Sequence, residues 1–577
     1  MKKLRGVAAS RGICVGPIFK FIRAELKIEL HTVENPQQEV DRFHAALAEA
    51  KQQIGKIHAK ALQESSKTDA AIFEAHQMIL DDPEFTGAVE SKINGEKTNA
   101  ESAVNAAAQK FAATMAAMND EYFKARAVDI LDVGNRVLRI LLGVAESPTA
   151  NLKVPSVIVA DDLTPSDTIL LDKSLVLGFC TARGSATSHT AILARGLGLP
   201  AVAGVGNEIL NENDGERIIV DGTHGIAIID PDDATADEYD RRDKLAQSIR
   251  AEALKHAAEP AVTLDGVRVE VAANIGDVKG SQAAVQNGAE GSGLLRTEFL
   301  YLERSNLPTE EEQYAAYRAI LDTFEQRPVV LRTLDVGGDK EIPYMGLAAE
   351  SNSFLGQRAL RLCLTRPDIF KPQLRAALRA GKDRNLKIMY PMVAAPSEVR
   401  AARKVYEECV AELKAEGKPC AENIEVGIMV EIPSAAVVAD QLAREVDFFS
   451  IGTNDLSQYT MAADRTNPKV AHLSNAFQPA VLRLIREVIK AAHKEGKWAG
   501  MCGELAGEPL AAPILIGLGL DEFSMSPPMV PLIKQIIRNL NAEEMKSVAA
   551  YALDLDTPEA VQEYVKKKVP FIEEICD

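Results

Sequence analysis

A histidine follows a turn of small and hydroxylated residues, Gly184 to Ser188, and precedes an apolar segment that ends at Arg195. The spacing predicts a tight turn with exposed backbone donors and then a helix that begins near His189, capped by Thr187 or Ser188. Backbone N–H groups at a helix N-terminus stabilise anions, so a phosphoryl group on His189 would be favoured there. The spacing alone leaves two interpretations open: a nucleophilic histidine that carries a phosphoryl group, and a capping loop with an incidental histidine.

A second set of candidate residues follows apolar runs in the later part of the chain. Arg296, Arg332 and Arg465 lie at or after the ends of such runs. A guanidinium group matches both carboxylate and phosphate, so these arginines suit a small substrate that carries both groups. Glu431 and Asp455 end two further runs and suit Mg²⁺, which binds a few carboxylates together with substrate oxygens. A capping ion pair would explain one charged run end, but five ends with coherent chemistry indicate an active site.

Cys502 ends another of these runs. A lone cysteine at a strand end is commonly a small buried hydrophobic residue. It can also act as an acid or base when a metal and arginines tune its pKa. The spacing leaves both interpretations open.

These candidates require a common scaffold to bring them together. From about residue 262, eight strand-like runs alternate with helical stretches over about 315 residues, the number and size of a (β/α)8 barrel. The runs are Val267–Ala273, Gly291–Arg296, Val329–Leu334, Leu386–Tyr390, Val426–Glu431, Phe448–Gly452, Trp498–Cys502 and Phe523–Met525. Active sites of such barrels lie at the C-terminal ends of the strands, where the arginines, the carboxylates and Cys502 fall. We therefore predict a barrel over residues 261–577, preceded by a charged linker helix over 230–260.

Two kinds of patterning share the first part of the chain. Apolar residues recur at three- and four-residue steps after the helix-start signal Asn35-Pro36, which predicts a helical bundle over residues 31–144. The bundle is inserted in an α/β domain that residues 1–30 and 145–229 form together. The strand-like runs of that domain are Val154–Ala160, Ser174–Cys180, Leu199–Val205 and Arg217–Val220.

Length and composition limit the class of protein. A chain of 577 residues is too long for one hydrophobic core. The net charge of −18 disfavours nucleic acid as a partner, and no apolar run approaches the roughly 20 residues of a membrane span. The N-terminal residues do not form a signal peptide, and seven scattered cysteines fit a reducing compartment. We expect a cytoplasmic protein without membrane insertion.

Over essentially its whole length the chain resembles the Enzyme I family, the phosphoenolpyruvate-protein phosphotransferases of the bacterial phosphoenolpyruvate:sugar phosphotransferase system. The motifs that carry the resemblance are Thr-Ser-His-Thr-Ala-Ile, Gly-Leu-Leu-Arg-Thr-Glu-Phe-Leu, Leu-Asp-Val-Gly-Gly-Asp-Lys, Met-Val-Glu-Ile-Pro-Ser, Ile-Gly-Thr-Asn-Asp-Leu-Ser-Gln-Tyr, Ala-Asp-Arg and Met-Cys-Gly-Glu. Related dikinases and synthases share several of these motifs but carry a nucleotide-binding domain for which this chain has no room. The implied fold is multidomain α/β: a swivelling phosphohistidine domain with an inserted helical bundle, followed by a (β/α)8 (TIM) barrel.

The resemblance also implies a reaction and its residues. Phosphoenolpyruvate would phosphorylate His189, which would pass the group to the phosphocarrier protein HPr, and pyruvate would be released. The implied substrate-binding residues are Arg296, Arg332, Asn454, Asp455 and Arg465. The implied Mg²⁺ ligands are Glu431 and Asp455, Cys502 would protonate the enolate, and Thr168 would lie near the histidine. The bundle would bind HPr, and the barrel would form a homodimer.

The histidine loop departs from the family pattern. Enzyme I commonly has Gly-Gly-x-Thr-Ser-His, often with arginine at the variable position, whereas this chain has Gly184-Ser185-Ala186. Loss of a basic side chain removes a phosphate contact and leaves the identity of the carrier open. Two other interpretations therefore stay open: a transferase that serves a carrier other than HPr, and a silent regulatory protein that only binds phosphoenolpyruvate or a carrier.

Overall fold

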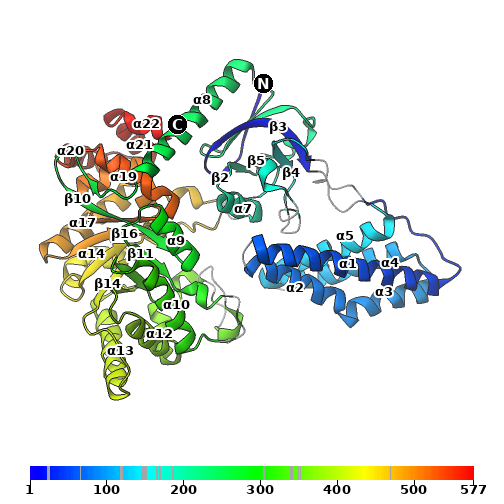
Figure 1. Cartoon of the computed structure of the whole chain (residues 1–577), viewed down its shortest axis with the longest axis horizontal. Coiled ribbons are helices and arrows are strands. Elements are labelled where there is room, and N and C mark those ends of the chain that lie inside the picture. Colours follow the sequence, from blue (N-terminus) through cyan, green and yellow to red (C-terminus); the bar gives the residue numbers. More distant parts are fainter. Residues whose placement is uncertain are drawn as a thin grey trace. The chain divides into compact units, whose positions relative to one another are not determined.

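The computed structural model describes residues 1–21, 26–64, 67–116, 121–144, 152–163, 167, 171–184, 188–302, 304, 306–337, 342–347, 350, 352–467 and 469–576 (Figure 1). The chain forms two compact units, Met1–Leu245 and Ala246–Asp577. Among the helices of the described ranges, none is long and apolar enough to cross a membrane.

The first unit contains a mixed sheet whose strands come from two distant parts of the chain. Their order across the sheet is β1-β8-β7-β3-β4-β5-β6-β2. The strands are β1 (Lys2–Arg5), β2 (Val7–Ser10), β3 (Ile13–Phe21), β4 (Ser156–Ala160), β5 (Val176–Thr181), β6 (Ala201–Ala203), β7 (Arg217–Asp221) and β8 (Ile226–Ile229). β3, β4, β5 and β6 run parallel, and the other pairings are antiparallel. The N-terminal residues thus supply strands to the same sheet as the segment after the bundle.

A bundle of helices lies in the sequence between β3 and β4. Its helices are α1 (Pro36–Glu64), α2 (Lys67–Asp81), α3 (Pro83–Glu96), α4 (Ala100–Ala116) and α5 (Glu121–Leu142). The predicted apolar face of α1 is buried, since Phe43, Ala50 and Ile54 are fully inaccessible to solvent. The break predicted at Asp82-Pro83 separates α2 from α3, because the Asp82 side chain accepts a hydrogen bond from the Glu84 N–H and caps α3.

The histidine segment forms α7 (His189–Leu197) beside the sheet of the first unit. Ser188 is the N-cap, and its Oγ accepts a hydrogen bond from the Ala191 N–H at 3.4 Å. Gly198 ends the helix in the left-handed conformation, where glycine carries no steric penalty. Arg195 anchors the helix to the sheet by donating to the Ala9 carbonyl at 2.7 Å. Thr187, the alternative cap, lies outside the described residues.

The predicted linker segment forms one long helix, α8 (Asp233–Lys255). The boundary between the two units falls within it, at Leu245 and Ala246. Tyr239 packs against the sheet of the first unit, and Ile249 packs against the core of the second.

The second unit is the predicted barrel. Eight parallel strands close on themselves through the pairing of β10 with β11, and β9 (Ala261–Val262) adds an antiparallel edge to β10. The barrel strands are β10 (Arg268–Ile275), β11 (Ser292–Arg296), β12 (Val329–Arg332), β13 (Leu386–Tyr390), β14 (Glu425–Val430), β15 (Phe448–Ile451), β16 (Trp498–Met501) and β17 (Glu522–Met525). Each predicted run corresponds to one strand, with ends that differ by at most two residues. The fold-class prediction is therefore confirmed.

Helices between and after the strands cover the barrel. They are α9 (Val278–Gln286), α10 (Glu310–Phe324), α11 (Leu360–Thr365), α12 (Pro367–Ala380), α13 (Pro396–Ala415), α14 (Pro433–Val437), α15 (Ala439–Leu442), α16 (Thr453–Met461), α17 (Pro479–Lys494), α18 (Ala512–Leu518), α19 (Val530–Arg538), α20 (Ala542–Ala552), α21 (Pro558–Lys568) and α22 (Phe571–Cys576). The outward side chains of the strands pack against these helices in one large core. The inward side chains form a second cluster, which contains Leu294, Val330, Met389, Met429, Phe448 and Cys502.

Two glutamates face each other near the N-terminal ends of adjacent strands in the barrel. Glu270 of β10 and Glu522 of β17 are direct cross-strand partners. Burial raises the pKa of Glu522 to about 8, the Glu270 and Asp521 carboxylates add to the rise, and Lys387 opposes it. A carboxyl group whose pKa is raised by folding stabilises the protein below its unfolded pKa and loses that contribution as the pH rises through its folded pKa.

We therefore expect Glu522→Gln to stabilise the barrel increasingly as the pH rises from 4.5 to about 8, where the difference levels off, because glutamine never acquires the buried charge. The two proteins should have nearly equal stability at about pH 4, where Glu522 is protonated in both states. Urea unfolding can be followed by the fluorescence of Trp498, the one tryptophan of the chain, which lies in the barrel. Exposed Glu563, changed to Gln, is the control. A stability difference that does not vary with pH would contradict the prediction.

Candidate functional site

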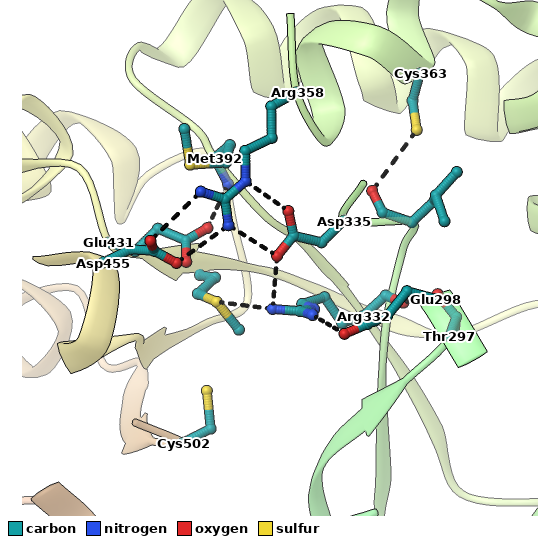
Figure 2. Close-up of polar contacts among 12 residues, drawn as sticks. Thr297, Glu298, Arg332, Asp335, Arg358, Cys363, Met392, Glu431, Asp455 and Cys502 are labelled. Carbon is teal, nitrogen blue, oxygen red and sulfur yellow. Dashed lines mark hydrogen bonds and ion pairs between the residues drawn. The ribbon is translucent and has the colours of Figure 1, made fainter. Parts of the chain in front are cut away.

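The C-terminal ends of several barrel strands bring charged side chains into one network (Figure 2). Arg332 is the last residue of β12, Glu431 directly follows β14, and Asp455 lies in the first turn of α16 after β15. Figure 2 shows these side chains converging above the strands, as the sequence predicted. Arg296, the last residue of β11, lies directly opposite Arg332 in the strand pairing.

Arg332 is held between two carboxylates. It donates to the Glu298 Oε1 atom at 2.8 Å, and its other terminal nitrogen lies 3.0 Å from the Asp335 Oδ2 atom. Burial by itself would lower the pKa of Arg332, but Glu298, Asp335 and Glu431 raise it above its usual value. The guanidinium group is therefore charged and fixed in direction before any ligand binds.

Arg358 connects two parts of the network, and sequence reasoning missed it. Its Nε lies 3.0 Å from Asp335 Oδ1, and one terminal nitrogen lies 3.2 Å from Asp455 Oδ2. The other terminal nitrogen donates to the Tyr459 hydroxyl at 3.2 Å. The side chain is only 2% exposed. Arg358 lies between β12 and β13, away from any strand end, so the search for charged strand ends could not find it.

Backbone geometry at Gly337 allows Arg358 to approach. Gly337 has a φ of 110°, and a Cβ atom there would lie 3.0 Å from the Arg358 Cβ. A side chain at this position would be strained and would crowd the arginine. The Val-Gly-Gly stretch after β12 is the feature of the sequence that could have predicted this, because glycine lets the backbone at Gly337 approach the Arg358 side chain closely.

Glu431 is almost fully buried and lies in an excess of negative charge. Its Oε1 accepts a hydrogen bond from the Met392 N–H at 2.6 Å. Burial, followed by the Asp455 and Asp335 carboxylates, raises its pKa to about 8, although the arginines oppose this. The electrostatic environment of Glu431 therefore favours a nearby positive charge.

The buried charges of this network do not balance among the described residues. Four carboxylates face two guanidinium groups in the buried set Glu298, Arg332, Asp335, Arg358, Glu431 and Asp455. With all four carboxylates ionised, which for Glu431 requires a nearby cation at neutral pH, the surplus equals the charge of one divalent cation. Within the described ranges no three His, Cys, Asp or Glu side chains form a metal cluster. Two carboxylates nevertheless fit Mg²⁺, which commonly binds one or two of them together with substrate phosphate and water.

The other predicted substrate-binding residues lie around the network. Arg465 is 29% exposed, and its terminal nitrogen lies 3.6 Å from Asp455 Oδ1. Arg296 is also partly exposed. The Asn454 side chain fixes the loop after β16 by accepting a hydrogen bond from the Glu504 N–H at 3.0 Å. Arg296 and Arg465 are thus partly accessible to solvent, while Arg332 and Arg358 are buried and paired with carboxylates.

Cys502 follows β16 and is 4% exposed. Burial raises the pKa of its thiol to about 11, although a side-chain hydrogen bond with Ser450 and the charge of Arg332 lower it in part. In Figure 2 its sulfur points toward the arginine–carboxylate network. The thiol is therefore protonated at neutral pH, which is the form that donates a proton. Cys502 is thus buried, as one interpretation predicts, and it adjoins the charged site; its role as an acid stays a prediction.

His189 lies in the other unit, at the first position of α7. Its side chain, Thr168, Ser185 and Ala186 lie outside the part of the chain that the structure describes. Thr190 donates to Asp162 Oδ1 at 3.2 Å and fixes the first turn of α7. A capped helix N-terminus at this histidine agrees with the predicted anion-stabilising geometry.

Comparison with known proteins gives matches along nearly the whole chain. Family models described as the PEP-utilising enzyme N-terminal domain, mobile domain and PEP-binding domain match residues 5–126, 152–225 and 250–542. A phosphoenolpyruvate-protein phosphotransferase of Bacillus sp. (strain S) is 48% identical over 98% of this chain and 98% of its own length. The protein of that name from Bacillus subtilis (strain 168) is 47% identical over 98% of this chain and 100% of its own length. An NMR solution structure of Enzyme I matches 42% of this chain and 98% of its own chain at 44% identity, with a TM-score of 0.38.

The network around Arg358 generates a stability prediction. Arg358→Met should lower the free energy of unfolding of the barrel by about 3–5 kcal/mol, because it leaves buried carboxylates without their partner. Urea unfolding followed by Trp498 fluorescence measures this. Arg366→Met is the matched control, since Arg366 forms an equally short two-bond pair with Asp368 at the surface and should cost less than about 1 kcal/mol. Equal losses of unfolding free energy in the two variants would show that the ion pairs of Arg358 contribute no more to stability than a surface pair does.

Proposed function

The chain belongs to the PEP-utilising enzymes, among the phosphoenolpyruvate-protein phosphotransferases, and on this premise we propose that His189 carries the phosphoryl group from phosphoenolpyruvate to the histidine of the phosphocarrier HPr. The chain is an enzyme that transfers a phosphoryl group from phosphoenolpyruvate to protein. The convergence of Arg332, Glu431 and Asp455 at one end of the barrel is the observation that carries the proposal.

Phosphoenolpyruvate carries a carboxylate and a phosphate, and the barrel offers arginines suited to both. Arg296 and Arg465 are the accessible donors, and Arg332, opposite Arg296 in the strand pairing, adds a fixed positive charge. Asn454 and the backbone at Asp455 supply further contacts, as the resemblance implies. Binding energy from these groups is used to orient the phosphorus for in-line attack, which supplies much of the acceleration in phosphoryl transfer.

Mg²⁺ is the cofactor that the buried charge surplus fits best. Glu431 and Asp455 would hold it, since both carboxylates lie in the excess of negative charge described above. When bound, the cation would offset charge on the substrate oxygens and on the transferring group.

The transfer itself breaks the bond between phosphorus and the enol oxygen and forms a bond between phosphorus and a ring nitrogen of neutral His189. The electron pair of the broken bond leaves on the enolate of pyruvate. Cys502 then gives its thiol proton to the methylene carbon of the enolate, which yields pyruvate. A thiol with a pKa of about 11 keeps this proton at neutral pH until a strong carbon base is formed.

The two substrates of His189 are bound by different parts of the chain. Phosphoenolpyruvate occupies the barrel, whereas the helical bundle over residues 31–144 is the proposed HPr site. His189 therefore has to reach each partner in turn, and α8, which contains the unit boundary, is the proposed linker for that movement. The resemblance further supports a homodimer formed through the barrel.

The redox state of the cysteines supports a location in the cytoplasm. The cysteines whose side chains the structure describes are all free and buried, at positions 14, 180, 363, 409, 420 and 502. Reduced thiols are typical of that compartment.

His189→Ala should abolish labelling by [³²P]phosphoenolpyruvate and pyruvate release in the presence of HPr, because the only acceptor atom for phosphorus is removed. His224→Ala is the matched control in the same sheet domain; its imidazole contacts Asp221 in a turn, and it should retain labelling. Label that persists in the His189 variant would refute the assignment. Normal autophosphorylation without transfer to HPr would point to another carrier.

Glu431→Gln should weaken divalent-cation binding and remove most Mg²⁺-dependent activity, because glutamine keeps the shape and the contact with Met392 but loses the charge. Binding of Mn²⁺, followed by electron paramagnetic resonance, provides a readout independent of turnover. Glu425→Gln changes the other end of the same strand, where Glu425 pairs with Lys387, and should bind Mn²⁺ normally. Unchanged Mn²⁺ affinity in Glu431→Gln would contradict the metal assignment.

A further inference from the structure

Two polar residues on the inner wall of the barrel, Asn274 and Ser524, form hydrogen bonds that connect Ser524, through Asn274, to the main chain of Cys502. Asn274, near the end of β10, donates from its Nδ2 to the Cys502 carbonyl at 3.0 Å. Ser524 of β17 donates from its Oγ to the Asn274 Oδ1 at 2.7 Å. Neither residue carries a part in the reaction described so far. Both lie among inward side chains, where an amide and a hydroxyl replace the apolar residues found elsewhere in the inner cluster.

The chemistry of the three groups fixes the orientation of the Asn274 amide. A carbonyl oxygen only accepts hydrogen bonds, so the group of Asn274 that faces Cys502 is the NH₂. The amide oxygen then faces Ser524, whose hydroxyl has to donate. Both polar groups of the Asn274 amide thus have hydrogen-bond partners in one orientation only, so the amide is held rigidly and does not flip.

Cys502 needs such a support because it lies just beyond a strand. The pairing of β16 with β17 ends with Met501 opposite Phe523. On the other side, the Cys502 N–H donates to the Ile451 carbonyl at 3.1 Å. The bond from Asn274 therefore holds the second polar group of this residue's main chain. The N–H is tied to the adjacent strand β15, and the carbonyl is tied to β10, which lies beyond β17 on the other side.

The side chain of Cys502 has weaker restraints than its backbone. Its neighbours in the inner cluster are apolar, among them Leu294, Met429 and Phe448. Its polar contacts are the Ser450 hydroxyl and the Ile451 carbonyl, which lies 4.0 Å from Sγ and is a weak contact. The direction of the thiol consequently depends on how the backbone at Cys502 is held.

We propose that Asn274, oriented by Ser524, is a positioning residue that fixes the backbone of Cys502 and so aims its thiol at the substrate carbon. This inference rests on the proposed proton-donor role of Cys502. Proton transfer to carbon requires close alignment, and a small displacement of the donor is costly in rate. Asn274 acts through Cys502 and makes no contact with substrate in this proposal.

The test uses the exchange of pyruvate methyl protons for deuterium, catalysed by the full-length enzyme with Mg²⁺ in D₂O and followed by ¹H NMR. In this exchange the Cys502 thiolate takes a methyl proton, so that an S–H bond forms as the C–H bond breaks and its electron pair goes to the enolate. The thiol then exchanges its proton for deuterium with D₂O, and the reverse step places that deuterium on carbon. Asn274→Leu should slow exchange about fivefold to tenfold, the cost of one lost hydrogen bond at a reacting group. Ser524→Ala should slow it about twofold, since the donor to Cys502 remains but is no longer oriented.

Two controls separate positioning from general damage. The KM for phosphoenolpyruvate should stay unchanged in both variants, because the arginines are untouched. Asn287→Leu removes another asparagine whose amide donates to a main-chain carbonyl, that of Ala283 in α9, and should exchange normally. Combined with Cys502→Ala, the Asn274 change should slow exchange no further than Cys502→Ala does alone.

Each contrary outcome has a defined meaning. If Asn274→Leu slows exchange by the same factor with and without Cys502, the residue does not act through the thiol and the inference is overturned. If Asn274→Leu unfolds, Ser524→Ala decides, and a wild-type exchange rate there overturns the inference. Wild-type exchange in Cys502→Ala alone would instead refute the proton-donor role and remove the basis of the inference with it.

Discussion

The ion network around Arg358 is the constraint on which the site depends. Asp335 and Asp455 follow different barrel strands, and Arg358 binds both at 3.0–3.4 Å while almost fully buried. Removing charges from water is costly unless they are paired, so each member requires the others. Because Asp335 also holds Arg332, the position of the predicted substrate arginine follows from a residue that contacts no predicted ligand.

The barrel makes this arrangement possible by bringing distant segments to one end of a rigid sheet. The acids come from the ends of β14 and β15 and the loops after β11 and β12, yet they share one small volume. Such crowding of carboxylates is unfavourable in isolation, as the raised pKa of Glu431 indicates. A divalent cation bound to these carboxylates, and an anion bound to the accessible arginines, would complete the charge balance and stabilise the site. Ligand binding and the stability of this region are therefore expected to be coupled.

Apolar patterning in the sequence predicted the barrel because buried parallel strands form nearly continuous hydrophobic runs. The same rule explains the errors. The last predicted run begins at Phe523, because the charged Glu522 interrupts the apolar pattern. In the structure, β17 begins one residue earlier, at Glu522. Asn274 was left beyond the run ending at Ala273 for the same reason. Arg358 lies in a long connection whose path depends on tertiary contacts, and no local period reports those contacts. The site residues at strand ends were predictable, whereas the residues that support them were not.

The arginines of the barrel differ in what they have left to offer a ligand. A guanidinium group has five N–H donors. Arg332 uses its two terminal nitrogens on Glu298 and Asp335, and its Nε is buried without a partner among the described residues. Of its three nitrogens, only Nε is therefore not engaged with a carboxylate. Arg358, by contrast, uses all three of its nitrogens on Asp335, Asp455 and Tyr459. Burial and pairing thus divide the arginines into Arg358, which only supports the network, Arg332, which supports it and keeps its Nε–H without a partner among the described residues, and the partly exposed Arg296 and Arg465.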